Sequence, residues 1–282
     1  MLFRSSAGLS PLSGDARVAS ANVSTRFVII GGGPAGNTAA THAARFGAEV
    51  TLIERDIIGG AAHLWDCIPS KTMIATGGAL AFSRRIEGMG LEQQEAEVDI
   101  DGLTARVADI QGRLQKNTTQ LLESQGVRLM HGAARLLGPN SIEVTTANGV
   151  EVLPADAILI STGTSPRVPE WCFPDGERIL TTRHCYPPKI FPKSITVVGS
   201  GVTGVEFVHM FSSFGAEVTL VVSRQQVLPM KDPEVAAVLE DDFLRRGVKL
   251  LKGARATSID REGDEVVVRR SEEHTSELQS PD

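Results

Sequence analysis

Residues 28–52 read VIIGGGPAGNTAATHAARFGAEVTL, and residues 196–220 read TVVGSGVTGVEFVHMFSSFGAEVTL. The two segments align without a gap, and their last seven residues, FGAEVTL, are identical. Each contains an apolar run, a glycine-rich turn, a stretch of helical character that ends near a glycine, and a second apolar run. The first apolar runs, residues 27–30 and 195–198, predict strands buried on both faces of a parallel sheet. The chain is therefore predicted to contain the same βαβ unit twice.

Both glycine-rich turns carry the pattern G-x-G-x-x-G between a predicted strand and a predicted helix, which is the context that a dinucleotide site requires. The first glycine makes the turn, the second admits a pyrophosphate, the third lets helix and strand pack, and the helix N-terminus favours negative charge. Two purely structural turns are the alternative, and the repetition argues against it. The predicted dinucleotide contacts are Gly31, Gly33, Pro34, Ala35 and Gly36 in the first copy, and Gly199, Gly201, Val202, Thr203 and Gly204 in the second.

The two copies differ at the end of the second strand, where a ribose would bind. The first copy has Glu54 there, an acidic residue of the kind that hydrogen-bonds a ribose 2′-hydroxyl. The second copy has Val222 at the matching position, followed by Ser223 and Arg224. Because this copy loses the carboxylate and gains a cation two residues later, the second site is predicted to take NADPH, or to tolerate NADPH besides NADH. The alternative for Arg224 is a solvated surface charge.

Composition and charge limit the class of protein. The chain has 282 residues, of which 41% are hydrophobic and 22% charged, as in a two-domain α/β protein. Its net charge of −6 argues against a nucleic-acid surface, and no apolar run is long enough for an integral membrane segment. Cys67, Cys172 and Cys185 are too few and too irregularly spaced for a disulfide framework or a zinc site, which predicts a reducing, cytoplasmic location.

The domain organisation follows from the repeats and their flanks. Residues 1–25 are rich in Ser, Ala and Arg without the apolar region of a signal peptide, and are predicted to be a disordered extension. Residues 26–165 and 166–269 are predicted to be two domains that meet where a proline-rich stretch begins. Residues 270–282 begin with RSEEHTSELQSP, which matches the translation of a common sequencing adapter. They are predicted to be an artefactual tail, which leaves the second domain incomplete.

Three kinds of element are predicted between the copies. Residues 59–85 predict a helix that starts after a glycine pair. Apolar residues at helical spacing from Leu103 to Leu122 predict a long amphipathic helix whose apolar stripe faces the core. Residues 127–160 alternate β-like runs with turn signals, which predicts hairpins, and the last apolar run there predicts another buried strand.

The ordered set of motifs resembles a known family. GGGPAG, an acidic residue ending the next strand, GG…CIPSK, STGTSP and GSGVTGVE are similar to the motifs of the FAD-dependent pyridine nucleotide–disulfide oxidoreductases, over about residues 25–269. The resemblance implies an α/β fold with two Rossmann-like domains, truncated at the C-terminus. It implies FAD on the first copy, NADPH or NADH on the second, and a homodimeric parent protein. It also implies cofactor contacts at Gly60, Lys71, Thr162, Gly163 and Glu206.

The redox-active cysteine pair of that family is incomplete here. The family has C-x-x-x-x-C before I/V-P-S-K, whereas residues 59–71 read GGAAHLWDCIPSK. Cys67 holds the position nearest the flavin, and Ala62 stands where the other cysteine belongs. Because dithiol–disulfide exchange needs two thiols, disulfide reduction by the usual route is excluded. The pattern resembles a branch of actinobacterial NAD(P)H:quinone reductases, which implies a quinone or another small-molecule electron acceptor.

The resemblance also implies catalytic candidates that do not depend on the pair. Lys71 and Glu206 match a buried lysine and glutamate that flank the flavin and the nicotinamide, and Cys67 completes the set. Two other readings stay open. In one, Cys67 carries thiol chemistry alone or with a cysteine outside this sequence. In the other, the chain is an inactive flavin-binding fragment.

Overall fold

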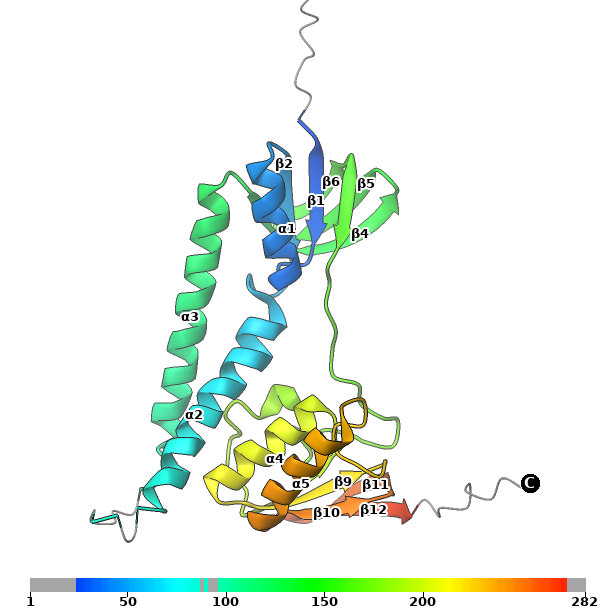
Figure 1. Ribbon diagram of the computed structural model, residues 1–282. Coiled ribbons are helices and arrows are strands. Elements are labelled where there is room, and N and C mark those ends of the chain that lie inside the picture. The colour runs from blue at the N-terminus through cyan, green and yellow to red at the C-terminus, as the bar shows by residue number, and fades with distance from the viewer. Residues whose placement is uncertain (1–23, 87–88, 91–95, 273–282) are drawn as a thin grey trace, which may run out of the picture.

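The computed structural model describes residues 24–86, 89–90 and 96–272 (Figure 1). Residues 1–23 of the predicted N-terminal extension and most of the predicted artefactual tail therefore lie outside the described residues. The first βαβ unit consists of strand β1 (Arg26–Ile30), helix α1 (Pro34–Arg45) and strand β2 (Glu49–Glu54). Two later strands, β3 (Arg128–His131) and β7 (Ala157–Ile160), flank it in a parallel sheet of order β3-β2-β1-β7. This order, with β1 inside the sheet, is that of a dinucleotide-binding half-fold.

The second βαβ unit repeats the arrangement. Strand β8 (Ser194–Val198), helix α4 (Val202–Phe214) and strand β9 (Glu217–Val222) are followed by helix α5 (Pro233–Arg245) and strand β10 (Lys249–Lys252). The parallel sheet has the order β10-β9-β8, which matches the order of β3, β2 and β1. The two predicted βαβ units are therefore confirmed.

A two-stranded antiparallel hairpin, β11 (Ala254–Glu262) and β12 (Glu265–Glu272), follows the second sheet. The register pairs Glu272 with Ala254. Residues 270–272, the first three of the predicted tail, therefore lie in a strand, and the artefactual origin of the tail stays a prediction.

The helices predicted between the two copies are confirmed. A π-helical turn, η1 (Ala62–Cys67), leads directly into α2 (Ile68–Ser83), and α3 (Ile100–Ser124) follows. Asp99 caps α3 by accepting a hydrogen bond from the backbone N–H of Gly102 at 2.9 Å. Such a cap satisfies one of the donors that a helix start leaves unpaired.

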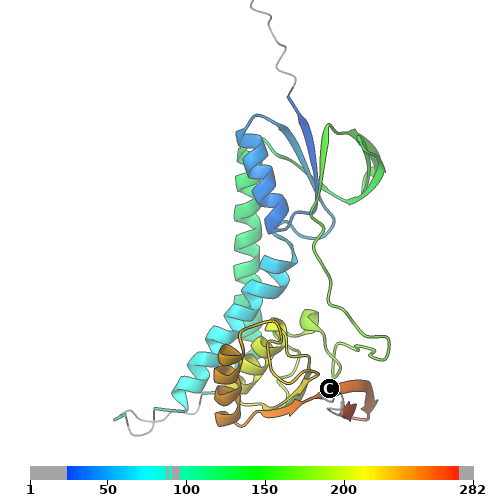
Figure 2. The ribbon, with the colours of Figure 1, turned by 45° about the vertical axis from the view of Figure 1, so that its right-hand side comes forward.

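The predicted hairpins form a three-stranded antiparallel sheet of β4 (Ala133–Gly138), β5 (Ser141–Thr146) and β6 (Gly149–Pro154). Figure 2 shows this sheet curling beside the first parallel sheet. After β7 the chain passes to the second unit through an extended connection, residues 161–193, whose regular structure is the short 3₁₀ helix η2 (Thr182–His184).

Helices α2 and α3 run from the first unit down to the second, where α2 lies against α4 (Figure 1). The approach is close at Gly77, where a Cβ atom would lie 3.1 Å from the Cβ of Ser213 and 3.2 Å from the ring of Phe214. One apolar core joins the two helices to the second unit. Its buried members from α2 and α3 are Met73, Leu80, Leu103 and Val107, and those from α4 are Val205, Phe207, Val208, Met210, Phe211 and Phe214.

Two strands are less buried than the sequence predicts. Strands β7 and β8 are edge strands of their sheets, and Ile160 and Val198 are 60% and 41% exposed. Along β8 the exposed and half-buried residues alternate, so one face of the strand is covered and the other is open. The prediction of two buried faces was wrong because it assumed helices on both sides of each strand. Within the described ranges, none of the helices is long and apolar enough to cross a membrane.

Candidate functional site

The first glycine loop is shaped by close backbone approaches. Gly31 has a φ of +110°, and a Cβ there would lie 2.3 Å from the carbonyl oxygen of Ser161. A Cβ on Gly36 would lie 1.9 Å from the carbonyl oxygen of Gly31. Any side chain at either position would collide with backbone, so only glycine lets α1 start directly at the end of β1.

Both helix starts are available to an anion. Gly33 is the N-cap of α1 and Gly201 is the N-cap of α4, and neither helix start has a side-chain cap or an acidic residue in its first turn. Uncapped N–H groups and the positive end of the helix macrodipole favour a bound phosphate. Pro34 and Ala35 in α1, and Val202 and Thr203 in α4, occupy these first turns.

Glu54 reaches back to the first loop. Its carboxylate accepts hydrogen bonds from the N–H of Gly32 at 2.6 Å and from the N–H of Asp56 at 2.8 Å, one on each oxygen. A carboxylate oxygen can accept a second hydrogen bond. Glu54 can therefore still receive a ribose hydroxyl while its position is fixed by the loop.

The remaining predicted contacts of the first site gather around the same loop. A Cβ on Gly60 would lie 2.5 Å from the Cα of Gly33, so these two turns touch. Thr162 and Gly163 lie just beyond the end of β7, after Ser161, and the neighbour of β7 in the sheet is β1. The backbone nitrogen of Thr162 lies 3.1 Å from the Cβ position of Gly31. The structure therefore brings the predicted glycines, Glu54 and Thr162 to one edge of the sheet.

The second loop repeats this geometry with more open surroundings. Gly199 has a φ of +107°, and a Cβ on Gly204 would lie 1.9 Å from the carbonyl oxygen of Gly199. A cleft of about 350 Å³ lies at this loop. It is lined by the predicted Gly199, Ser223 and Arg224, and by Trp171, Val198, Val221, Ala254, Arg255 and Ala256.

The residue of the second copy that matches Glu54 is a buried core residue. Val222 is fully buried and packs in the core of the second unit. Arg224, two residues later, is exposed and lines the cleft. The second copy therefore lacks a carboxylate at the position that matches Glu54 and presents a cation two residues later.

Lys71 and Glu206 meet at the junction of the two units. Lys71 is the fourth residue of α2 and Glu206 is the fifth residue of α4. They are 135 residues apart in the sequence, and their side chains form an ion pair. Their side chains are 57% and 31% exposed. The burial that the family resemblance implies is therefore not seen here, because the pair lies where the two helix starts emerge from the shared core.

Cys67 is exposed at the end of η1, immediately before α2. The two other cysteines lie in the connection; Cys172 is half-buried, and Cys185 is buried and donates to the carbonyl oxygen of Thr181 at 3.3 Å. Burial raises the pKa of Cys185 to about 12, so it stays a thiol at neutral pH. All three cysteines are free.

Sequence reasoning missed a contact between η1 and the connection. The guanidinium of Arg183 lies 4.5 Å from the ring centre of Trp65 and 4.0 Å from the carboxylate of Asp66. It also missed the cleft residues Trp171 and Arg255. These side chains belong to an irregular segment and to a later hairpin, where neither periodicity nor a motif marks them.

A family model described as pyridine nucleotide-disulphide oxidoreductase matches residues 25–280. The chain belongs to the pyridine nucleotide-disulphide oxidoreductase family. This family is FAD- and NAD(P)H-dependent, in agreement with two glycine loops that each end at an uncapped helix start.

Relatives within the family carry two kinds of name. An NAD(P)H dehydrogenase (quinone) from Mycobacterium tuberculosis is 42% identical over 265 residues, which are 90% of this chain and 54% of the relative. A dihydrolipoyl dehydrogenase from Zymomonas mobilis is 35% identical over 226 residues, 80% of this chain and 48% of the relative. The chain thus spans about half the length of the relatives that it matches.

Solved structures agree with this placement. LpdA from Mycobacterium tuberculosis superposes with a TM-score of 0.81 at 41% identity, covering 88% of this chain and 55% of LpdA. The HOCl-induced flavoprotein disulfide reductase RclA from Escherichia coli gives a TM-score of 0.73 at 25% identity, covering 88% of this chain and 53% of RclA.

Proposed function

We propose that this chain provides the two dinucleotide sites of an oxidoreductase that transfers a hydride from NAD(P)H to FAD and then electrons to a quinone-type acceptor. The observation that carries the proposal is the Lys71–Glu206 ion pair, which joins α2 to α4, the helix that follows the second glycine loop. Helix α2 comes shortly after the Gly60 turn, which touches the first glycine loop at Gly33. One ion pair therefore links the two sites between which a hydride would pass.

The residues of the first site fit FAD. The α1 N–H groups would bind the pyrophosphate, and the Glu54 carboxylate, held by Gly32, would accept a ribose hydroxyl. FAD, when bound, accepts a hydride from NAD(P)H and passes electrons to an acceptor. Lys71 would supply a positive charge beside the negative charge that the reduced ring carries, and Glu206 would hold the lysine side chain in place.

The residues of the second site fit a pyridine nucleotide. The α4 N–H groups would bind the pyrophosphate, and Ser223 and Arg224 line the adjoining cleft. A guanidinium at this position would pair with a 2′-phosphate, whereas the buried Val222 would neither accept from a 2′-hydroxyl nor repel the phosphate. These features support NADPH as the preferred donor.

The acceptor is proposed to be a quinone because the thiol route is incomplete. Ala62 begins η1 where a second sulfur would be needed, and Cys67 is a free cysteine. The relative from Mycobacterium tuberculosis that is named for quinone reduction is 42% identical to this chain. A homodimeric parent and a cytoplasmic location stay predictions.

The experiment uses the full chain loaded with FAD. Under anaerobic conditions NADPH should bleach the flavin absorbance, and menadione should restore it with turnover, whereas lipoamide and oxidised glutathione should not be reduced. The variant Cys67→Ser should still reduce menadione, because the proposed route needs no thiol. Loss of menadione reduction in Cys67→Ser would favour thiol chemistry, and an unbleached flavin would favour an inactive flavin-binding fragment.

A further inference from the structure

The cleft at the second glycine loop has a wall that the duplicated unit does not supply. Trp171 comes from the connection between the two units, and residues 254–256 come from the start of β11. Trp171 is half-buried and lies in a turn closed by a hydrogen bond from the N–H of Cys172 to the carbonyl oxygen of Pro169, at 3.0 Å. The connection therefore covers the cleft as well as linking the units.

The lining of the cleft suits a ligand with two chemical parts. Arg224 and Arg255, with Ser223, offer cationic and polar groups to a phosphate. The indole of Trp171 and the small apolar side chains around it offer a flat, apolar surface, on which an aromatic base can stack whatever its hydrogen-bonding pattern. A phosphorylated adenosine has both parts.

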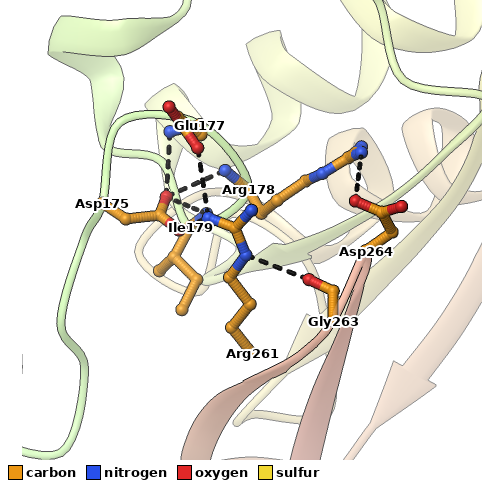
Figure 3. A network of polar contacts seen from close by, with 7 residues as sticks. All are labelled: Asp175, Glu177, Arg178, Ile179, Arg261, Gly263 and Asp264. Atoms are coloured by element: carbon orange, nitrogen blue, oxygen red, sulfur yellow. Dashed lines mark hydrogen bonds and ion pairs between the residues drawn. The ribbon is translucent and has the colours of Figure 1, made fainter.

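The connection next to Trp171 is folded into a tight turn around a single carboxylate (Figure 3). One oxygen of Asp175 accepts hydrogen bonds from the backbone N–H groups of Glu177, Arg178 and Ile179, at 2.8, 2.8 and 2.9 Å. Burial opposes the charge, but these donors together with Arg261 keep the pKa of Asp175 well below its ordinary value. The turn is therefore held by an ionised group at any ordinary pH.

The same carboxylate ties the turn to the β11–β12 hairpin. The Nη1 atom of Arg261 lies 2.9 Å from the second carboxylate oxygen of Asp175 and 3.2 Å from the carboxylate of Glu177. Arg178 pairs with Asp264 at 3.4 Å (Figure 3). Because the first residues of β11 also line the cleft, this network fixes the connection to the element that forms the opposite part of the lining.

We infer that Trp171 is the surface against which the adenine of NAD(P)H packs, and that the Asp175–Arg261 network is a positioning device that holds Trp171 on the cleft. The inference rests on the proposed function, because it takes NAD(P)H as the ligand of the second loop. It assigns a binding residue to an irregular segment that lies outside the duplicated residues 196–220.

The test measures binding of 2′-phospho-ADP-ribose, which is NADPH without its nicotinamide, to the full chain by calorimetry. Trp171→Ala should weaken binding about 5- to 150-fold, the range for loss of one base–aromatic stack. Trp171→Phe should keep most of the affinity because it retains an aromatic face. The matched control is Phe173→Ala, which removes a 76% exposed ring from the same segment outside the cleft and should leave binding unchanged.

A second ligand distinguishes the loss of the Trp171 contact from general damage to the protein. Reduced nicotinamide mononucleotide lacks the adenosine, so it should reduce the FAD-loaded Trp171→Ala variant as fast as the unchanged chain. For the positioning role, Asp175→Asn should raise KM for NADPH with kcat unchanged. The double variant Trp171→Ala/Asp175→Asn should bind 2′-phospho-ADP-ribose no more weakly than Trp171→Ala alone, because the Asp175–Arg261 network acts through Trp171.

Equal affinity of Trp171→Ala and the unchanged chain would overturn the inference, and so would an unchanged chain that does not bind 2′-phospho-ADP-ribose. An equal loss of the rate of flavin reduction by reduced nicotinamide mononucleotide would overturn it too, because the effect of Trp171→Ala would then not depend on the adenosine part of the ligand. If Trp171→Ala weakens the binding of 2′-phospho-ADP-ribose while NADPH leaves the flavin of the unchanged chain oxidised, the inference stands and the proposed function alone fails.

Discussion

Two adjacent glycines in α2 allow a measurement of how closely the two units are packed. Gly77 is buried against α4, with Ser213 and Phe214 at 3.1–3.3 Å from the position of a Cβ atom. Gly78 is exposed, and nothing lies within 4 Å of its Cβ position. Because both glycines lie inside the same helix, replacing either one by valine changes the intrinsic helix propensity by a similar amount. The difference between Gly77→Val and Gly78→Val therefore isolates the contact between α2 and α4.

The magnitude follows from those distances. A Cβ at 3.1–3.3 Å already forces its neighbours to move by a few tenths of an ångström, and valine adds two further methyl carbons. Overpacking of this kind costs about 1–3 kcal/mol, whereas valine at Gly78 meets open space. We expect Gly77→Val to unfold with a free energy about 1–3 kcal/mol lower than that of Gly78→Val, and its Tm to be roughly 2–12 °C lower.

The assay is urea unfolding of the two variants, followed in parallel by circular dichroism and by tryptophan emission. The FAD content after purification of each variant adds a functional measurement, because displacement of α2 moves Lys71 away from Glu206. Equal unfolding free energies for Gly77→Val and Gly78→Val would show that α2 and α4 are not in close contact, and would refute the packing of the two units described above.

Three further predictions concern single side chains. Glu54→Ala should weaken FAD binding by about 1–3 kcal/mol, measured by fluorescence titration, while Glu49→Ala at the other end of the same strand should not. Arg224→Ala should lower kcat/KM for NADPH relative to NADH by about tenfold to a hundredfold, and an unchanged ratio would make Arg224 a surface charge. Burial and the neighbouring Arg246 lower the pKa of His209 below 6.5, so the free energy of unfolding should fall as the pH drops from 7 through 6.5 toward the lowered pKa. His209→Gln should flatten this dependence, and an identical pH profile for the variant would contradict the assignment.

The fold could be predicted where local patterns decide it. The apolar runs, the glycine turns and the helical stretches of both copies each depend on residues close together in the sequence, and all formed as expected. Burial could not be predicted in the same way. Val198 and Ile160 are apolar residues at strand ends, but their exposure depends on which helices cover the edge of each sheet. That depends on tertiary packing and not on the strand's own residues.

The residues of the candidate site also fall into two groups, those marked by a local sequence motif and those placed by tertiary packing. The glycines, Glu54 and Arg224 could be found because the fingerprint fixes their spacing relative to a strand and a helix. The meeting of Lys71 with Glu206 was implied by the family resemblance, and their spacing of 135 residues carries no signal of contact. Trp171 belongs to a segment without periodicity. Its position on the cleft depends on a hairpin that begins more than 80 residues later, so no pattern within the segment could reveal it.

The duplication shows how a repeated local sequence acquires two different sites. Both loops share the collision that requires the third glycine, since a Cβ on Gly36 or on Gly204 would lie 1.9 Å from a backbone oxygen. They differ in what lies beyond the first glycine. The carbonyl oxygen of Ser161, the residue after β7, would lie 2.3 Å from a Cβ on Gly31, whereas nothing lies within 4 Å of the Cβ position of Gly199. The loop sequence therefore specifies the turn, and the element packed beside it determines how open the surroundings of the loop are. In the second copy the space beside the first glycine belongs to a cleft. Gly199 lines this cleft together with Trp171 from the connection between the two units.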